Sequence, residues 1–309
     1  MKLSPSVFAA VIGLSSLMPI SASAQNYAGS VISSSNLSSG ILYGTDISAY
    51  NDPTAVLGQP TTLDNEISDT YHASMVQGAY GLDETSGQNL LVNFDSSGTG
   101  QLTVQMSAPI THTGTTWFNQ DFIVFSNGFF PGLSGYASEG TDMSTYQIGS
   151  GATYGTLPQV SVSADGVTFY TVNPSSSLEY PENPYHWDGL TADPTTAGWG
   201  ALNDFTKPVD PSLTAADFAG QTVAYADNTL YNGSAGGTSY SFFGQTPLTT
   251  IDYIRFSANA TGPGGVVDAV VAVGTAAAVP EASTFWSLLL GLLGFAMYAI
   301  RRNIRSVFR

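Results

Sequence analysis

The sequence contains no cysteine, few basic residues and only three histidines. Because Cys is absent, no disulfide stabilises the fold, and an apolar core or bound ions must do so. His72, His112 and His186 are far apart in the sequence, so the clustered His and Cys ligands of a zinc site are also missing. These absences exclude disulfide-rich secreted domains and give no support to a zinc enzyme.

Basic residues are especially scarce between the two ends of the chain. The sequence has 7 Lys and Arg against 23 Asp and Glu, and only Lys207 and Arg255 of the basic residues lie between positions 25 and 278. This strongly negative body disfavours nucleic acid and anionic lipid as partners. It favours cations, calcium in particular, because calcium binds carboxylate and carbonyl oxygens. The alternative is that the acids serve solubility alone.

Catalytic motifs are also lacking. Asn232-Gly233-Ser234-Ala235-Gly236 lacks the first glycine of the nucleophile elbow that many hydrolases use. No glycine-rich segment follows the strand-to-helix order of a phosphate-binding loop. Two carboxylates in a β-sandwich could still flank a glycosidic bond, so a polysaccharide-modifying enzyme stays an alternative. The sequence otherwise predicts a protein without catalytic activity.

The N-terminal 24 residues have the pattern of a secretory signal peptide. Lys2 provides the positive start, Val7 to Met18 forms an apolar core, and Ala22-Ser23-Ala24 is a cleavage site of the A-x-A type. The alternative is a membrane anchor that is retained. We therefore expect an exported protein, with residues 1–24 removed.

The C-terminal tail, 279–309, has the pattern of a membrane helix with a cytoplasmic end. Ser283 to Ile300 is apolar and uncharged, which meets the lower limit for a transmembrane span. Arg301 and Arg302 follow at once, so the positive-inside rule places the C-terminus in the cytoplasm. The alternative is a buried helix of a globular fold, but the apolar residues surround this helix instead of forming one stripe.

The tail resembles the PEP-CTERM sorting signal of Gram-negative bacteria. The residues that carry the resemblance are Val279, Pro280 and Glu281, the apolar run, and the basic stop at Arg301 and Arg302. The resemblance implies an inner-membrane intermediate, cleavage near the motif by an exosortase-type membrane transpeptidase, and release to the cell surface or medium in association with exopolysaccharide. Ala282 departs from the usual pattern, which has a second proline.

The body has the pattern of an all-β domain. Strands are expected at Leu90 to Phe94, Gln101 to Met106, Asp121 to Phe125, Gln159 to Val172 with a type I′ turn at Asp165-Gly166, Ile251 to Ser257, and Val266 to Val273. Short helices are expected at Thr214 to Asp217, a capping box, and at Thr222 to Tyr231, closed by Asn232-Gly233. Many short strands with glycine-rich turns predict a jelly-roll-like β-sandwich at 50–276. Residues 25–49 form either a flexible leader or a weak edge strand.

Segments of the body also resemble PEP-CTERM-tailed surface proteins. They include Asp121 to Phe129, Val162 to Phe169, Asp210 to Gly220, Leu230 to Thr238, Tyr253 to Phe256 and Val267 to Val270. The resemblance implies a β-sandwich surface protein with no assigned reaction. Ser126 stands where many relatives have an acid, and Ser239 to Phe242 also departs from their pattern. Two oxygen ligands that relatives could offer are therefore missing here.

Two sets of residues are candidate binding sites. Asp121 and Asp268 lie beside buried-type strands, where an isolated carboxylate is costly unless it is paired or metal-bound, and Asn127 could add a carbonyl oxygen. These three residues predict a calcium site, unless backbone N–H groups satisfy both acids. The second set is a carbohydrate site in a proline-rich loop, unless its aromatic rings fold inward. Its members are Tyr185, Trp187, Asp188 and Trp199.

The sequence thus predicts an exported, non-catalytic surface or extracellular-matrix protein of a Gram-negative bacterium. Its first alternative is a lectin-like carbohydrate-binding module, and its second is the polysaccharide-modifying enzyme. Binding of a glycan without turnover separates the two alternatives from each other.

Overall fold

The computed structural model describes residues 25–38, 41–42, 45–46, 51–63, 72–79, 82–83, 88–135, 137, 141–153, 155–190, 199–260 and 264–275. The predicted signal peptide at 1–24 and the predicted sorting tail at 279–309, with its membrane helix at 283–300, lie outside these residues. Within the described ranges, no helix is long and apolar enough to cross a membrane.

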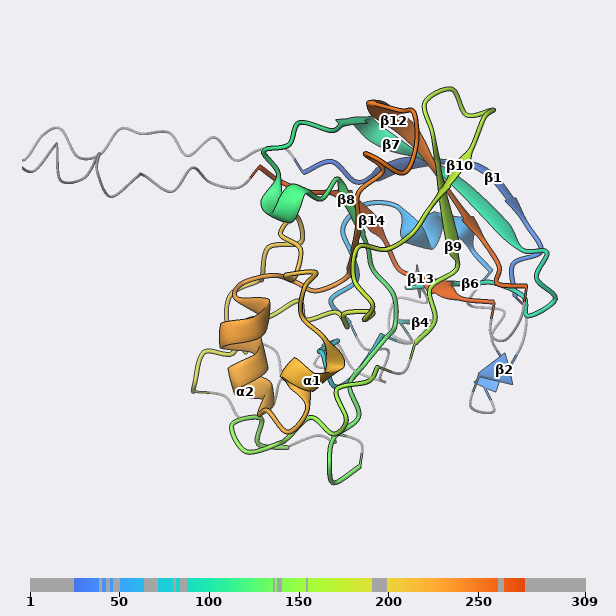
Figure 1. Ribbon diagram of the computed structural model, residues 1–309. Helices are drawn as coiled ribbons and strands as arrows, with labels where there is room; N and C mark the ends of the chain where they lie inside the picture. Colours follow the sequence, from blue (N-terminus) through green and yellow to red (C-terminus); the bar gives the residue numbers. More distant parts are fainter. Residues whose placement is uncertain are drawn as a thin grey trace, which may run out of the picture. The chain divides into compact units, whose positions relative to one another are not determined.

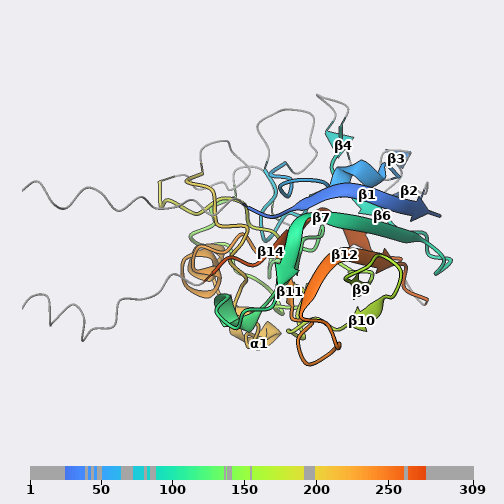
Figure 2. The ribbon, with the colours of Figure 1, turned by 90° about the horizontal axis from the view of Figure 1, so that it is seen from above.

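The larger of the two main sheets has five antiparallel strands in the order β1-β7-β12-β9-β10 (Figures 1 and 2). Its strands are β1 (Ala28–Ser35), β7 (Gln101–Thr111), β12 (Thr250–Ser257), β9 (Gln159–Ser163) and β10 (Tyr170–Val172). On β12, Ile254 and Phe256 are fully buried while Arg255 between them is partly exposed. This period of two places one face of the sheet against the core.

The smaller sheet has three antiparallel strands in the order β11-β8-β14. Its strands are β11 (Thr238–Tyr240), β8 (Phe122–Val124) and β14 (Val270–Ala272). Three two-stranded pairs accompany it: β13 (Val266–Val267) with β6 (Val92–Asn93), β2 (Ile41–Leu42) with β3 (Thr45–Asp46), and β4 (Leu82–Asp83) with β5 (Gln88–Asn89).

The two main sheets face each other across one apolar core. Val104 and Ile254 of the larger sheet belong to the same buried cluster as Phe122, Val124 and Val270 of the smaller sheet. The described body is therefore all-β and sandwich-like, as the sequence predicts.

The predicted strands are found where the sequence places them, with shorter or longer bounds. The apolar run at Asp121 to Phe125 contains β8, whose three residues are fully buried. The segment Val266 to Val273 contains both β13 and β14. Strand β7 runs beyond the predicted Met106 to Thr111, and its pairing with β12 shifts register between Gln105 and Ile110. Pro109 lies in this irregular stretch, where its missing N–H removes a ladder hydrogen bond.

The N-terminal boundary of the domain differs from the prediction. Residues Ala28–Ser35 form the edge strand β1, which pairs with β7. This part of 25–49 is therefore an edge strand and not a flexible leader, and the sandwich begins before the predicted start at residue 50. The Ser- and Gly-rich composition of the strand hides it, because an edge strand needs few buried side chains.

The predicted hairpin exists, but the prediction of a type I′ turn is wrong. The ladder ends with Tyr170 opposite Val162, which leaves a longer loop in which Gly166 has a positive φ of 72° and Asp165 does not. Asp165 Oδ1 instead accepts hydrogen bonds from the N–H groups of Val167 and Thr168, each at 2.8 Å. A side-chain carboxylate thus organises the turn, as Asp commonly does.

The predicted short helices are confirmed. α1 (Ala215–Phe218) begins after Thr214, whose N–H and hydroxyl both donate to the Asp217 carboxylate. α2 (Val223–Tyr225) begins after Thr222 and continues into the π-helical turn Ala226–Tyr231. Asn232, at φ 48°, ends that turn in the left-handed region. Two 3₁₀ turns, at Pro53–Val56 and Trp117–Asn119, complete the helical elements of the described residues.

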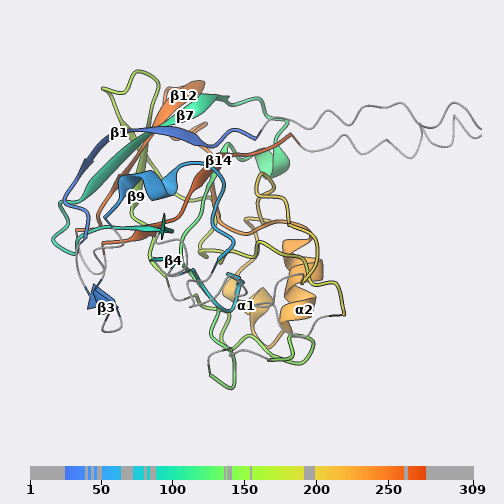
Figure 3. The same cartoon turned by 180° about the vertical axis from the view of Figure 1, so that it is seen from behind.

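The smaller sheet is covered on its outer face as well. Ile123 and Phe125 point away from the sandwich core and pack with Phe205 and Ala235 in a separate buried cluster. Figures 1 and 3 show α1 and α2 on the side of β8 and β14 that is opposite the larger sheet. Phe218 and Val223 of these helices belong to a further buried cluster. The body therefore has a third, mostly irregular layer over the smaller sheet.

Truncating a core residue of the central strand β12 tests this architecture. Ile254→Ala is expected to lower the free energy of unfolding by about 2–5 kcal/mol, because the removed atoms leave a cavity in a rigid core. Val167→Ala is the matched control, because Val167 is 80% exposed and its truncation should change the free energy by less than about 0.5 kcal/mol. Denaturant titration measures both, and similar values for the two variants would contradict the arrangement.

Candidate functional site

The three residues predicted to bind calcium do not converge. In the register of β8 with β14, Val273 N–H donates to the Asp121 carbonyl at 2.9 Å, whereas Asp268 N–H donates to the Phe125 carbonyl at 2.9 Å. Asp121 and Asp268 therefore lie at opposite ends of β8, roughly 13–16 Å apart along a strand. Asn127 follows β8 at the Asp268 end. The structure therefore does not bring Asp121, Asn127 and Asp268 together in one calcium site.

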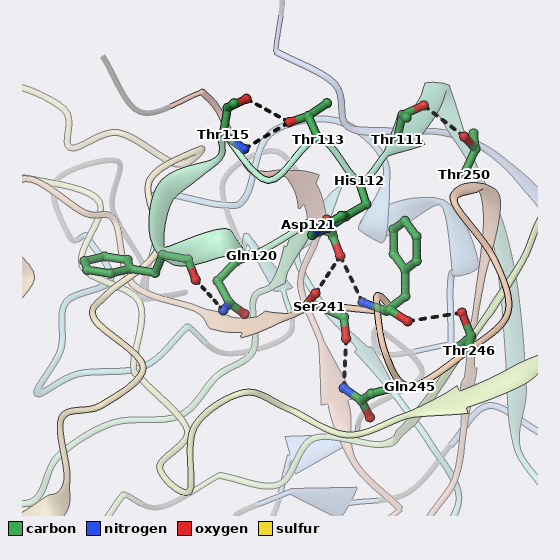
Figure 4. Close-up of polar contacts among 12 residues, drawn as sticks. Thr111, His112, Thr113, Thr115, Gln120, Asp121, Ser241, Gln245, Thr246 and Thr250 are labelled. Carbon is green, nitrogen blue, oxygen red and sulfur yellow. Dashed lines mark hydrogen bonds and ion pairs between the residues drawn. The ribbon is translucent and has the colours of Figure 1, made fainter. Parts of the chain in front are cut away.

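Asp121 is satisfied by donors from the protein. Its Oδ1 lies 2.8 Å from Nδ1 of His112, and its Oδ2 accepts from the Ser241 hydroxyl at 2.9 Å and the Phe242 N–H at 3.0 Å (Figure 4). Asp121 is 1% exposed, so these donors replace the water that burial removes. The carboxylate joins the end of β7, the start of β8 and the chain between β11 and β12.

The His112–Asp121 pair has a catalytic appearance, but its connectivity is not that of a hydrolase triad. In a triad the serine donates to the histidine, and the histidine donates to the acid. Here the Ser241 hydroxyl donates to Asp121 itself (Figure 4). The His112 ring instead stacks on Phe243, with centroids 4.2 Å apart and planes 5° apart. This stacking fixes the orientation of the His112 ring beside Asp121, which indicates a structural role for the ring.

The residues predicted to bind carbohydrate differ in their exposure. Trp199 is 1% exposed, and the rings of Tyr185 and Trp187 pack partly buried against the same cluster. Tyr185 also contacts the His72 ring, with centroids 4.6 Å apart. Asp188 is exposed, and its Oδ1 accepts from the Leu190 N–H at 2.7 Å. The four residues therefore do not form an exposed aromatic surface. For Trp199, the alternative that the ring folds inward holds.

Asp227 fixes the course of this loop, and sequence reasoning missed it. Asp227 is fully buried and accepts from Asn183 Nδ2 at 2.5 Å and from the Trp187 N–H at 2.8 Å. Nδ1 of His186 lies 2.9 Å away, within ion-pair distance. Burial raises the pKa of Asp227, and the bond from Trp187 opposes that effect. An acid inside a helical segment gave no signal of this role.

A second missed feature is a pair of buried carboxyl groups, Glu182 and Asp268, each 1% exposed. Asp268 Oδ2 accepts from the Thr61 N–H at 2.8 Å. Burial raises the pKa of Asp268 to about 7, and burial together with the neighbouring Asp268 raises the pKa of Glu182 well above its usual range. A hydrogen bond between two carboxyl groups requires a proton on one of them. Ionising both groups of the pair therefore costs much more free energy than ionising one.

Comparison with known proteins gives no assignment: no protein-family model and no curated protein matches the chain. Within the part of the chain that the structure describes, no group of three or more His, Cys, Asp or Glu side chains is arranged to hold a metal ion.

Removing the Asp121 carboxylate tests the contribution of its hydrogen bonds. Asp121→Ala leaves the Ser241 hydroxyl, the Phe242 N–H and His112 without their acceptor, so the free energy of unfolding should fall by about 2–4 kcal/mol. Asp142→Ala is the control, because Asp142 is exposed and its carboxylate accepts from the N–H and the hydroxyl of Ser144, which is a local contact. Its loss should cost less than about 1 kcal/mol. If urea titration gives equal losses of unfolding free energy for the two variants, the hydrogen bonds to Asp121 do not stabilise the fold.

The Glu182–Asp268 pair should make the free energy of unfolding depend on pH. The measurement is made with a chelator present, so that divalent cations do not contribute. The pKa of Asp268 is raised from 3.8 to about 7, so the folded state binds more protons than the unfolded state between these values. Stability from this group is complete below pH 4 and declines as pH rises toward 7. The wild-type chain should therefore lose stability relative to Asp268→Asn over that window. A difference between the two proteins that is constant with pH would contradict the pairing.

Proposed function

We propose that this chain is an exported, non-catalytic surface or extracellular-matrix protein of a Gram-negative bacterium. In this proposal an exosortase-type transpeptidase cleaves the chain near Val279, Pro280 and Glu281 after insertion of the tail into the inner membrane. The released body then associates with exopolysaccharide. The tail sequence supports the route, and the connectivity of the strands supports the kind of body that is delivered.

The order of the strands is the observation that carries the proposal. The Asp268 N–H donates to the Phe125 carbonyl, and the Phe125 N–H donates to the Ala269 carbonyl. These bonds extend the pairing of β8 with β14 as far as the start of β13, which pairs with β6. The smaller layer can therefore be described as β11-β8-β14 followed by β6. The other layer reads β7-β12-β9-β10, with β1 added at its edge. Apart from the β9–β10 hairpin, consecutive strands from β6 onward alternate between the two layers, which is the order of two Greek keys. This order supports a jelly roll, an architecture that capsid and lectin domains use.

The composition of the body is consistent with a delivered, extracellular domain. The chain has no Cys, so its folding is independent of the redox state of the compartment. Its core clusters and buried acid networks supply the stabilisation that disulfides would otherwise add. The negative surface favours solubility and cation uptake over binding to nucleic acid.

A lectin-like carbohydrate-binding module is the second candidate, and one surface feature favours it. Phe243 is 57% exposed and is held parallel to the His112 ring. The hydroxyl groups of Thr111 and Thr250, which bond to each other at 3.0 Å, belong to the same end of the sandwich (Figure 4). An exposed flat ring with a fixed orientation suits stacking on a sugar.

The intact mass of the protein recovered from membranes, cell surface and medium tests the first proposal. The account expects a surface or medium form that lacks 1–24 and ends near Pro280 and Glu281. Replacing Pro280 and Glu281 by Ala should leave the full tail in the inner-membrane fraction, whereas Thr275→Ala should not. A wild-type mass that runs to Arg309 only in the membrane would overturn the sorting proposal.

Retention on the exopolysaccharide of the producing cell tests the second candidate. Phe243→Ala is expected to weaken retention by about tenfold, which corresponds to about 1.4 kcal/mol. Val167→Ala, which also removes an exposed apolar side chain, should leave retention unchanged. Equal retention of the two variants would remove Phe243 from consideration, and absence of retention in the wild type would remove the lectin-like candidate.

A further inference from the structure

Glu182 and Asp268 differ from the other buried acids in having too few donors. Glu182 lies in the segment that runs beside β11, where the Asn183 N–H donates to Ala235 at 2.8 Å. Asp268 lies between β13 and β14 and receives the Thr61 N–H. Both side-chain oxygens of Glu182 are buried without a hydrogen-bond partner among the described residues. When both carboxyl groups are ionised, neither oxygen of Glu182 therefore has a donor.

The remaining buried aspartates provide an internal comparison. Asp121 receives the Ser241 hydroxyl and the Phe242 N–H and contacts His112. Asp227 receives the Trp187 N–H and the Asn183 amide and contacts His186. Each of these carboxylates has several donors and a histidine beside it. Among the described residues, the buried aspartates Asp121 and Asp227 are therefore well supplied with donors, and the Glu182–Asp268 pair is not.

We propose that Glu182 and Asp268 together bind one divalent cation, calcium by preference, inside the folded body. A shared proton would satisfy one oxygen of each group and would leave the second Glu182 oxygen uncompensated. A cation can contact oxygens of both groups and neutralises both charges. Calcium prefers carboxylate and carbonyl oxygens and completes its shell with water, so two acidic side chains suffice as the charged part of the site.

The cation would connect three segments that are distant in the sequence. Thr61 belongs to 51–63, Glu182 to the loop after β10, and Asp268 to the last strands. In a chain without Cys, such an ion takes the place of a covalent cross-link, and its binding energy is coupled to folding. The site is independent of the proposed export route and of any glycan bound at Phe243.

The test uses the full chain in detergent, treated with a chelator and then titrated with calcium chloride at pH 8. We expect the melting temperature to rise by several degrees, and calorimetric titration to give about one ion per chain. Glu182→Gln and Asp268→Asn should each abolish both responses. Glu179→Gln is the matched control, because Glu179 lies on the same segment and its carboxylate is already bonded by the Ser126 hydroxyl.

Each outcome decides the proposal. A calcium response that is lost in both pair variants and kept in Glu179→Gln supports it. A wild-type chain without any response overturns it and leaves a shared proton in the pair. A response that persists in both pair variants also overturns it, because the ion then binds elsewhere. If a pair variant fails to fold, the calorimetric titration of the wild-type chain decides. About one ion per chain supports the proposal, and a count well above one overturns it, because the ions then bind to the many surface acids.

Discussion

The structure of the body depends on a strand that is buried on both faces. Phe122 and Val124 of β8 pack into the core between the two sheets. Ile123 and Phe125, on the other face, pack under Phe205 and Ala235. A strand with apolar side chains on both faces cannot leave either face in water without losing the free energy of burial. The smaller sheet must therefore carry a second cover, and the long connections between strands supply it.

The buried acids follow from this cover. The connections that pass over the outer face bring polar backbone and side chains into the interior, and every such group needs a partner. Asp121 and Asp227 provide acceptors for donors in these connections, so they act as organisers of irregular chain. Glu182 and Asp268 lie in the same layered region, but neither oxygen of Glu182 has a donor, and Asp268 receives the Thr61 N–H alone among the bonds described here. The same constraint thus explains the satisfied acids and defines what is unusual about the remaining pair.

The sequence predicts the local elements of this fold better than its third layer. Continuous or alternating apolar residues identify β8 and β12, because burial imposes a period on each strand. The capping residues Thr214 and Asp217 identify α1 for a similar local reason. Strand β1 is less evident, because an edge strand made of Ser, Gly and Val buries few side chains. The turn at Asp165 was misassigned because its carboxylate, and not a pair of positive φ angles, stabilises it.

The candidate site was less predictable than the fold. Two of the residues chosen from the sequence, Asp121 and Asp268, are buried acids as expected, but the register of β8 with β14 separates them. The connection that brings Glu182 next to Asp268 is rich in proline and has no hydrophobic periodicity, so no sequence pattern indicates the pair. Pairings of this kind depend on long-range chain geometry, which a local pattern does not contain. For the aromatic loop residues the sequence left two alternatives open, and the inward one holds for Trp199, whose side chain is buried in a core.

Native-state hydrogen exchange tests the central role of β8 most directly. The account predicts that the amides of Ile123 and Val124 exchange only through global unfolding, with the largest protection in the body. Amides of the edge strand β1, such as Val31, should exchange earlier through local opening. If the β8 amides exchange as fast as those of β1, the doubly covered strand is not what holds the two layers and their cover together.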